Sequence, residues 1–277
     1  MMFKTVFKSV VLSSALIAAV QLHAATTKQA PVVIQGALDI ETDRMISQLK
    51  GVKTKTYGGW QFWEGTYQGY PIVISRTLMG MSNAAAATTL AIEHYHPKAI
   101  INQGTAGGHD PELKVFDIVL GKESENIGAF ITDKKVLGEG SNSLTWHKSF
   151  NLLPKNNTPE EEIRHLRFEG DSKLLAAANS LKSTYTQGKV VEGVIGSADV
   201  WNNELDRIQY FHQNYKTSVE EMETASAAQV ASLYKVPFLG IRVLSNNLTN
   251  NGNYNPGTGA ACQDYVLNVA KAYLAQK

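Results

Sequence analysis

The sequence has one cysteine, Cys262, among its 277 residues, so the chain has no internal disulfide and no pair of thiols for a zinc site. Its seven histidines form no HExxH pattern, and His94 and His96 are two positions apart near the end of a predicted helix, where they point to different sides. We therefore expect no metal, no cofactor, and a fold that is stabilised by packing.

An excess of charge of either sign is also absent. The chain carries 26 Lys and Arg against 25 Asp and Glu, a formal net charge of +1. Such a balance does not steer a protein toward nucleic acid or anionic lipid. We expect a small-molecule partner, with neither nucleic acid nor a membrane.

Only a short apolar run begins the chain. Lys4 and Lys8 give a basic start, residues 10–20 are apolar but too few to span a bilayer, and a small-residue junction follows near Ala24. This pattern predicts a secretory signal peptide over residues 1–24 and a periplasmic or secreted protein. An N-terminal core helix and an uncleaved anchor are the alternatives. Cleavage would leave 24 basic against 25 acidic residues, since the segment holds two lysines and no acid.

Strand-like and helix-like segments alternate through the rest of the chain. Apolar strand patterns stand at 32–38, 99–102, 117–121, 189–197 and 236–245, with glycine-punctuated alternation at 58–77. Helical patterns stand at 39–51, 82–95, 171–183, 221–235 and 258–276. This order predicts an α/β fold with a largely parallel sheet covered on both faces, in one domain over residues 25–277. Residues 122–170 lack a clear period and predict a surface excursion.

Polar or aromatic residues follow four of the predicted strands. These are Glu41, Thr105 in the QGTAGG stretch of residues 103–108, Trp201 and Asn246. In open α/β sheets ligands bind beyond the carboxyl ends of the strands. Residues 103–108 are then a phosphate-binding loop, a sugar-binding loop, or only a tight bend between two strands.

Five blocks of sequence resemble one family in order and spacing: GALDIET, INQGTAGGHDPELKVFDIV, GVIGSADVW, EEMETASAAQVA and VPFLGIRVLSN. They look like the methylthioadenosine/S-adenosylhomocysteine nucleosidase branch of the nucleoside phosphorylase superfamily. The resemblance implies a three-layer α/β sandwich with a mixed, largely parallel central sheet, and a homodimer. It also implies a purine nucleosidase, which hydrolyses the N-glycosidic bond of a purine nucleoside to the free base and a ribose derivative.

The resemblance also implies roles for single residues. Glu41 matches the carboxylate that activates water, Glu223 matches the carboxylate that binds the ribose hydroxyls, and Trp201 matches the aromatic that stacks on the purine. Met222 matches a residue packed on the sugar. Thr105 and Gly107 match the turn that lines the ribose and the water site, and Gly80 matches another close approach of the backbone.

Each of these residues has an ordinary structural alternative. Glu41 has the position of a solvated acid in the first turn of a helix, and Trp201 that of a core tryptophan. Ser218 and Glu221 have the S-x-x-E spacing of a capping box that would begin a helix. We assign the capping interpretation to Glu221 and the functional one to Glu223.

Asn246 departs from the family, which has an aspartate there to support protonation of the purine N7. An amide has no proton to transfer at neutral pH and offers only hydrogen bonds. The same residue type is found in trimeric purine nucleoside phosphorylases, which favour 6-oxopurines, so adenine and 6-oxopurine substrates both stay open. A phosphorylase is an alternative function, although the glycine loops lack the arginines that would hold phosphate. A non-catalytic nucleoside-binding or storage protein is another.

Overall fold

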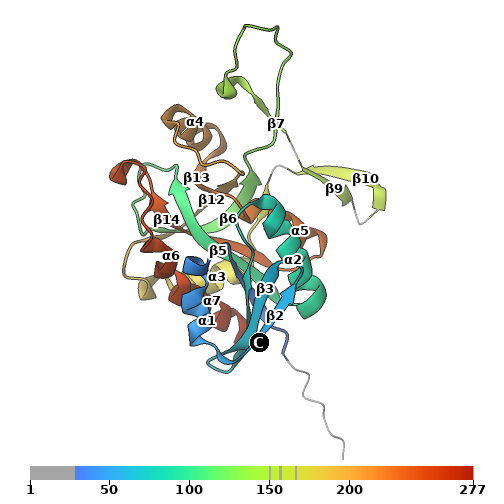
Figure 1. Ribbon diagram of the computed structural model, residues 1–277, viewed down its shortest axis with the longest axis vertical. Coiled ribbons are helices and arrows are strands. Elements are labelled where there is room, and N and C mark those ends of the chain that lie inside the picture. The colour runs from blue at the N-terminus through green and yellow to red at the C-terminus, as the bar shows by residue number, and fades with distance from the viewer. Residues whose placement is uncertain (1–28, 150, 156–157, 166, 277) are drawn as a thin grey trace, which may run out of the picture.

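The computed structural model describes residues 29–149, 151–155, 158–165 and 167–276, and the predicted signal peptide over 1–24 lies outside the described residues. A mixed ten-stranded sheet forms the centre of this part of the chain, and helices cover both of its faces (Figure 1). The predicted α/β class and its layered arrangement are therefore confirmed.

The strand order places distant parts of the sequence side by side. Across the sheet the strands are β11 (Phe168–Glu169), β6 (Ile118–Asn126), β12 (Val190–Ser197), β13 (Thr217–Glu221), β5 (Ala99–Gly108), β1 (Val32–Gly36), β4 (Tyr70–Arg76), β3 (Trp60–Tyr67) and β2 (Lys50–Tyr57), and β14 (Phe238–Asn246) pairs with both β5 and β6.

Two groups of parallel strands make up the centre of the sheet. Strands β1, β4, β5 and β14 run in one direction, and β6, β12 and β13 run in the other. The groups meet where β5 and β13 pair antiparallel through their last residues, with Val219 opposite Gly108 and Glu220 opposite Gly107. The carboxyl ends of both groups therefore converge on one place.

The central strands are buried on both faces. Val32 and Ile34 pack into one core cluster with α1 (Asp43–Gln48), α3 (Ser172–Ser180) and α7 (Gln263–Leu274). Val33 packs into a second cluster with α2 (Met81–Tyr95) and α5 (Thr224–Leu233) on the opposite face. Alternate residues of a strand point to opposite faces, so a continuous apolar run is what a doubly covered strand requires.

The stretch 122–170 contains more regular structure than its sequence predicts. It holds the end of β6 and the short strands β7 (Phe130–Ile131), β8 (His147–Lys148), β9 (Asn151–Lys155) and β10 (Thr158–His165) before β11. Figure 1 shows β7 and the β9–β10 pair projecting from the body of the molecule. The predicted excursion is thus correct in position, and its strands are ones that the sequence, lacking a clear period, did not reveal.

Several predicted boundaries are also wrong. β5 continues to Gly108, so the glycine stretch is part of a strand whose backbone pairs with β13 and β14. The predicted helix 39–51 is split into the 3₁₀ turn η1 (Asp39–Glu41), α1 and the start of β2. The glycine-punctuated alternation at 58–77 does form a hairpin, of β3 and β4, and β2 adds a third antiparallel strand to it.

Towards the C-terminus, β13 precedes a helix that begins only at Thr224. α4 (Leu205–Tyr215) was not predicted, because its mean hydropathy is low and its apolar residues form only a narrow stripe. The closing helix is broken into α6 (Thr258–Ala261) and α7.

Candidate active site

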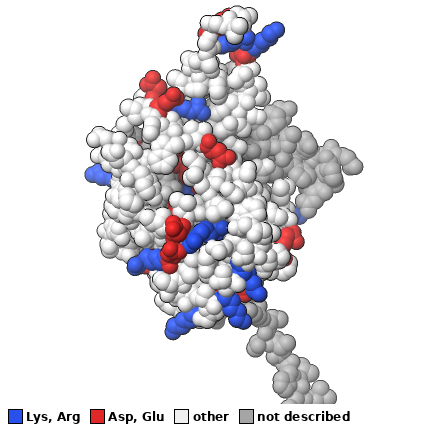
Figure 2. All heavy atoms as spheres, in the orientation of Figure 1, with Lys and Arg blue, Asp and Glu red and all other residues white. Residues whose placement is uncertain are grey.

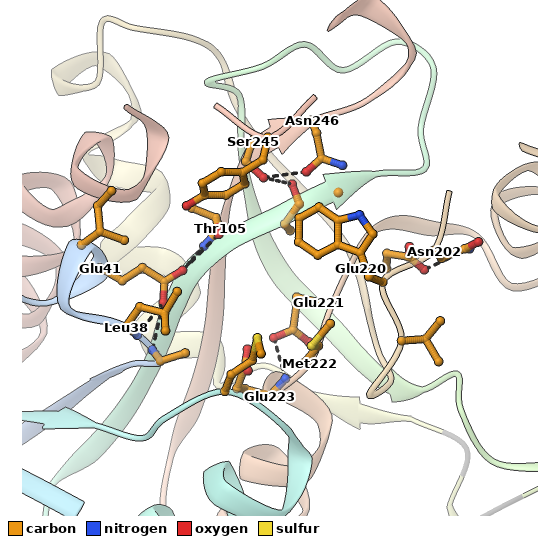
Figure 3. A pocket seen from close by; sticks show the side chains of 18 of the residues that line it. Leu38, Glu41, Thr105, Asn202, Glu220, Glu221, Met222, Glu223, Ser245 and Asn246 are labelled. Carbon is orange, nitrogen blue, oxygen red and sulfur yellow. Dashed lines mark hydrogen bonds between the residues drawn. The ribbon is translucent and has the colours of Figure 1, made fainter. Parts of the chain in front are cut away.

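A cavity of about 490 Å³ lies where the carboxyl ends of the two strand groups converge (Figure 3). Seven of the eight predicted site residues line it: Glu41, Thr105, Gly107, Trp201, Met222, Glu223 and Asn246. The eighth, Gly80, is not part of the lining, but its backbone N–H donates to Glu223 Oε1 at 2.8 Å. The structure therefore brings together residues from five separate segments of the chain.

Glu41 is held in place by four hydrogen bonds. Its Oε2 accepts from the backbone N–H groups of Ala37 at 2.9 Å and Leu38 at 3.2 Å, and its Oε1 accepts from the N–H of Thr105 at 2.8 Å and the Thr105 hydroxyl at 3.1 Å. The residue is only 4% exposed. The alternative of a solvated helix acid is therefore wrong.

Position 104 in β5 requires a glycine, because the carboxylate of Glu41 lies directly against it. A Cβ at position 104 would lie 2.8 Å from Glu41 Oε1, which is closer than real Cβ atoms approach oxygen. The strand can pass behind the carboxylate only without a side chain. Because Thr105 then directs both of its donors to the same oxygen, β5 fixes the orientation of Glu41.

Glu223 enters the cavity from the residue that precedes α5. It is 7% exposed, and its Oε2 lies 3.7 Å from Nη2 of Arg242. Burial, and next the nearby Glu221 carboxylate, raise the pKa of Glu223 to about 8. In the free protein at neutral pH this carboxyl group is therefore mostly protonated.

Ser218 and Glu221 do not form the predicted capping box, because both lie in β13, although Glu221 does accept from the N–H groups of Glu223 and Thr224 at the start of α5. Glu221 lies at the end of β13. Its carboxylate is buried against Arg242, which donates from Nε at 3.0 Å and also from Nη2. The Ser197 hydroxyl and the Thr224 N–H donate to it as well. Although burial opposes it, the positive charge of Arg242 together with these hydrogen bonds lowers the pKa of Glu221. Glu221 is therefore a buried anion in the wall of the cavity.

Trp201 presents an open aromatic face to the cavity, as a residue that is 58% exposed. The alternative of a core tryptophan is therefore wrong. Tyr254 lies beside it, with ring centroids 6.3 Å apart and an edge-on angle of 64°. Tyr254 also lines the cavity. We did not predict Tyr254, although an aromatic residue within the polar stretch after Asn246 is a signal of a binding loop.

Asn246 faces the cavity, and its neighbour does not. The side-chain oxygen Oδ1 of Asn246 accepts a hydrogen bond from the Ser245 hydroxyl at 2.7 Å. Asn247 instead donates to the backbone of Leu113 at 2.7 Å and accepts from Thr249. Asn247 thus anchors the loop, and the amide in the cavity is that of Asn246.

Within the part of the chain that the structure describes, no group of three or more His, Cys, Asp or Glu side chains is arranged to hold a metal ion. The same described residues contain no helix with the length and apolar character needed to cross a membrane. Cys262 is buried, and its thiol contacts Gln103 Oε1 at 3.3 Å.

Comparison with known proteins places the chain in a family. Residues 31–274 match the model of the phosphorylase superfamily. The 5′-methylthioadenosine/S-adenosylhomocysteine nucleosidase of Psychromonas ingrahamii is 30% identical over 214 residues, which are 77% of this chain and 84% of that protein. The Shewanella piezotolerans enzyme of the same name is 31% identical over 215 residues, 77% of this chain and 85% of its own.

A solved structure agrees with these sequence matches. The nucleosidase of the same name from Colwellia psychrerythraea, crystallised with adenine, superposes with a TM-score of 0.70 and 25% identity, covering 88% of this chain and 96% of that one. The fold and the sequence matches therefore agree. The chain therefore belongs to the 5′-methylthioadenosine/S-adenosylhomocysteine nucleosidase branch of the phosphorylase superfamily.

Proposed function

We propose that the protein is a purine nucleosidase that hydrolyses the N-glycosidic bond of a purine nucleoside. One observation carries the proposal: an oriented carboxylate, Glu41, a second carboxyl group, Glu223, and an open indole face, Trp201, line the same cavity. The proteins that this chain resembles are named as nucleosidases, which supports the same class of reaction.

The arrangement suits a hydrolysis with a sugar of oxocarbenium character. Water forms a bond to C1′ while the bond between C1′ and N9 breaks, and the bonding electron pair leaves with the base. Glu41 acts as the general base and takes a proton from the water, and solvent supplies the proton that the released purine finally carries. Glu223 would accept hydrogen bonds from the ribose hydroxyls, Met222 would pack on the sugar, and the Trp201 ring would stack on the purine.

The cavity is better suited to water than to phosphate as the nucleophile. A phosphate dianion needs basic side chains, and no Lys or Arg is among the described residues that line the cavity. Arg44 is paired with Asp264 at 2.5 Å, and Arg76 with Asp43 at 2.5 Å. Both arginines are therefore engaged outside the cavity.

Purine release with and without phosphate tests the proposal. We expect at least one of methylthioadenosine, inosine and guanosine to release its base at a rate that added phosphate does not raise, with free ribose or its 5′ derivative as the second product. Chromatography of both products measures this. Turnover that requires phosphate and yields a sugar 1-phosphate would instead make the protein a phosphorylase.

The raised pKa of Glu223 predicts a pH dependence. Below about pH 8 the carboxyl group carries a proton, which weakens its capacity to accept two hydrogen bonds from a diol. We therefore expect kcat/KM to rise as pH rises through about 8 and then to level, as measured with inosine or methylthioadenosine. The Glu223→Gln variant is expected to have a lower kcat/KM without this rise, and an unchanged profile in that variant would contradict the assignment.

The same shift has the opposite sign for stability. A carboxyl group whose pKa is raised from 4.5 to about 8 on folding holds a proton that the unfolded chain has lost in this range. The folded state therefore loses this contribution as pH rises toward 8. Urea unfolding of the wild type and of Glu223→Gln at the two ends of the range separates this effect from the kinetic one.

We further propose export and a homodimeric assembly. The basic and apolar start of the sequence supports export. Leu38 and Met79 line the cavity yet are 41% and 57% exposed, and a second copy of the chain would cover such an apolar rim. Cell fractionation with N-terminal sequencing tests the first proposal, and the mass in solution tests the second; a cytoplasmic, full-length or monomeric protein would contradict them.

The charges of the surface support a small-molecule partner. Most of the face shown in Figure 2 is uncharged, and acidic and basic side chains lie scattered over it in small groups, with mainly basic ones at its lower edge. Such a surface offers no extended positive stripe on this face for nucleic acid to follow.

A further inference from the structure

Glu220 and Asn246 converge over one glycine. In the sheet register, Gly107 of β5 stands opposite Glu220 of β13 on one side and Asn246 of β14 on the other. A Cβ at Gly107 would lie 3.3 Å from Asn246 Nδ2 and 3.8 Å from Glu220 Cγ. The two side chains therefore lean into the space above Gly107, and both line the cavity.

Glu220 is a largely buried acceptor at the end of the cavity away from Glu41. Figure 3 shows Glu220 beside Asn202, with Glu41 on the opposite side of the pocket. His109 Nε2 lies 3.0 Å from Glu220 Oε2, close enough for an ion pair but too bent for a straight hydrogen bond. Asn202 Nδ2 donates to the same oxygen at 3.4 Å.

These contacts leave one oxygen of Glu220 free. The side chain of His109 is 1% exposed and that of Glu220 is 13% exposed. The Thr217 hydroxyl lies 2.7 Å from His109 Nδ1, so a donation from Thr217 leaves the N–H of the ring on the side of Glu220. Among the described residues the contacts of the carboxylate go to Oε2, and Oε1 accepts no hydrogen bond. An ionised carboxylate accepts hydrogen bonds and donates none.

The two side chains match the edge of a 6-oxopurine. Hypoxanthine and guanine carry an N–H donor at N1 beside the acceptors O6 and N7, and guanine adds a 2-amino donor. Adenine has the opposite order, with an unprotonated N1 and a 6-amino donor. A carboxylate that faces adenine N1 would set two lone pairs against each other, whereas one that faces N1–H of a 6-oxopurine gains a charge-assisted hydrogen bond.

We propose that Glu220, with Asn246, selects 6-oxopurine nucleosides: Glu220 accepts from N1–H, and the Asn246 amide donates to O6 or N7. This rests on the proposed nucleosidase function of the same cavity. Negative charge that develops on a departing 6-oxopurine spreads over its ring and O6, so an amide N–H stabilises it without transferring a proton. The proposal thereby accounts for the amide at position 246.

Selectivity of turnover and of base binding tests the proposal. We expect kcat/KM for guanosine and inosine to exceed that for adenosine and methylthioadenosine by about 100-fold or more, since a site built around a substrate N–H rejects an analogue that lacks it. Glu220→Gln removes the charge and keeps the shape, and should narrow this ratio about tenfold or more. The exposed Glu112, outside the cavity lining, provides the matched variant Glu112→Gln, which should keep the ratio.

Binding of free hypoxanthine and free adenine to the wild type, measured by calorimetry, separates this proposal from the nucleosidase function. Hydrolysis that favours adenine nucleosides would overturn the selectivity and leave the nucleosidase intact. Selective binding of hypoxanthine without any turnover would keep the selectivity and overturn the nucleosidase. A ratio that Glu220→Gln leaves unchanged would remove Glu220 from base recognition, and equal binding of both bases without turnover would overturn both proposals.

Discussion

The Glu41→Gln variant is expected to lose hydrolysis by about 10²–10⁴-fold in kcat while it still binds nucleoside, because general base catalysis contributes about this much. Glutamine keeps the size of the side chain and an oxygen that can accept from Thr105. Its amide cannot take a proton from water, and its NH₂ group faces the N–H groups of both Ala37 and Leu38 with a donor instead of an acceptor. Single-turnover base release measures the rate, and calorimetry with the same nucleoside measures binding.

Asp43→Asn is the matched control for this variant. Asp43 is two residues from Glu41, its side chain is 68% exposed, and it pairs with Arg76 outside the cavity. An exposed ion pair contributes little to stability, so the control should fold and turn over normally. If Glu41→Gln keeps its rate within a few-fold of the wild type, as the control does, another group activates the water.

The fold could be predicted from the sequence where burial is complete on both faces. The runs around Val33 and Ile241 are continuous and apolar, which indicates strands covered by helices on both sides, and the structure buries them so. The antiparallel meeting of β5 and β13 could not be predicted. Their overlap is two residue pairs long, and the sequence EEMET that ends β13 has the composition of a helix start.

Resemblance predicted which residues would converge, but not how they are held. The motif around Glu41 predicts a carboxylate, whereas two of its four hydrogen-bond donors belong to Thr105, which is 64 residues away in the chain. Glu220 was missed because an acid beside Glu221 looks like part of a solvated cluster. Its distinction is spatial: it stands across Gly107 from Asn246, and no single-strand pattern contains that register.

The Arg242→Met variant is expected to lose about 3–5 kcal/mol of stability, because removing one partner of a buried ion pair leaves the other charge uncompensated. Arg242 is 1% exposed and donates from Nη1 to the Asn102 carbonyl at 3.0 Å and from Nη2 to its side-chain oxygen at 2.5 Å. It is also the cation that faces Glu221 and Glu223. The change in the urea concentration at the midpoint of unfolding measures this loss of stability. The pH is chosen so that, in the wild type, Glu221 is ionised and Glu223 is protonated.

The double variant Arg242→Met with Glu221→Gln separates loss of charge balance from loss of packing. Glutamine removes the stranded charge and can still accept from Ser197 and Thr224, so we expect the double variant to be more stable than Arg242→Met alone. Without the cation, the pKa of Glu223 should rise further, and the increase of kcat/KM with pH should move to higher pH in the single variant. If Arg242→Met is as stable as the wild type, Glu221 is neutral in the folded protein. If its profile of kcat/KM against pH is also unshifted, Arg242 has no role in setting the charge of the ribose end of the cavity.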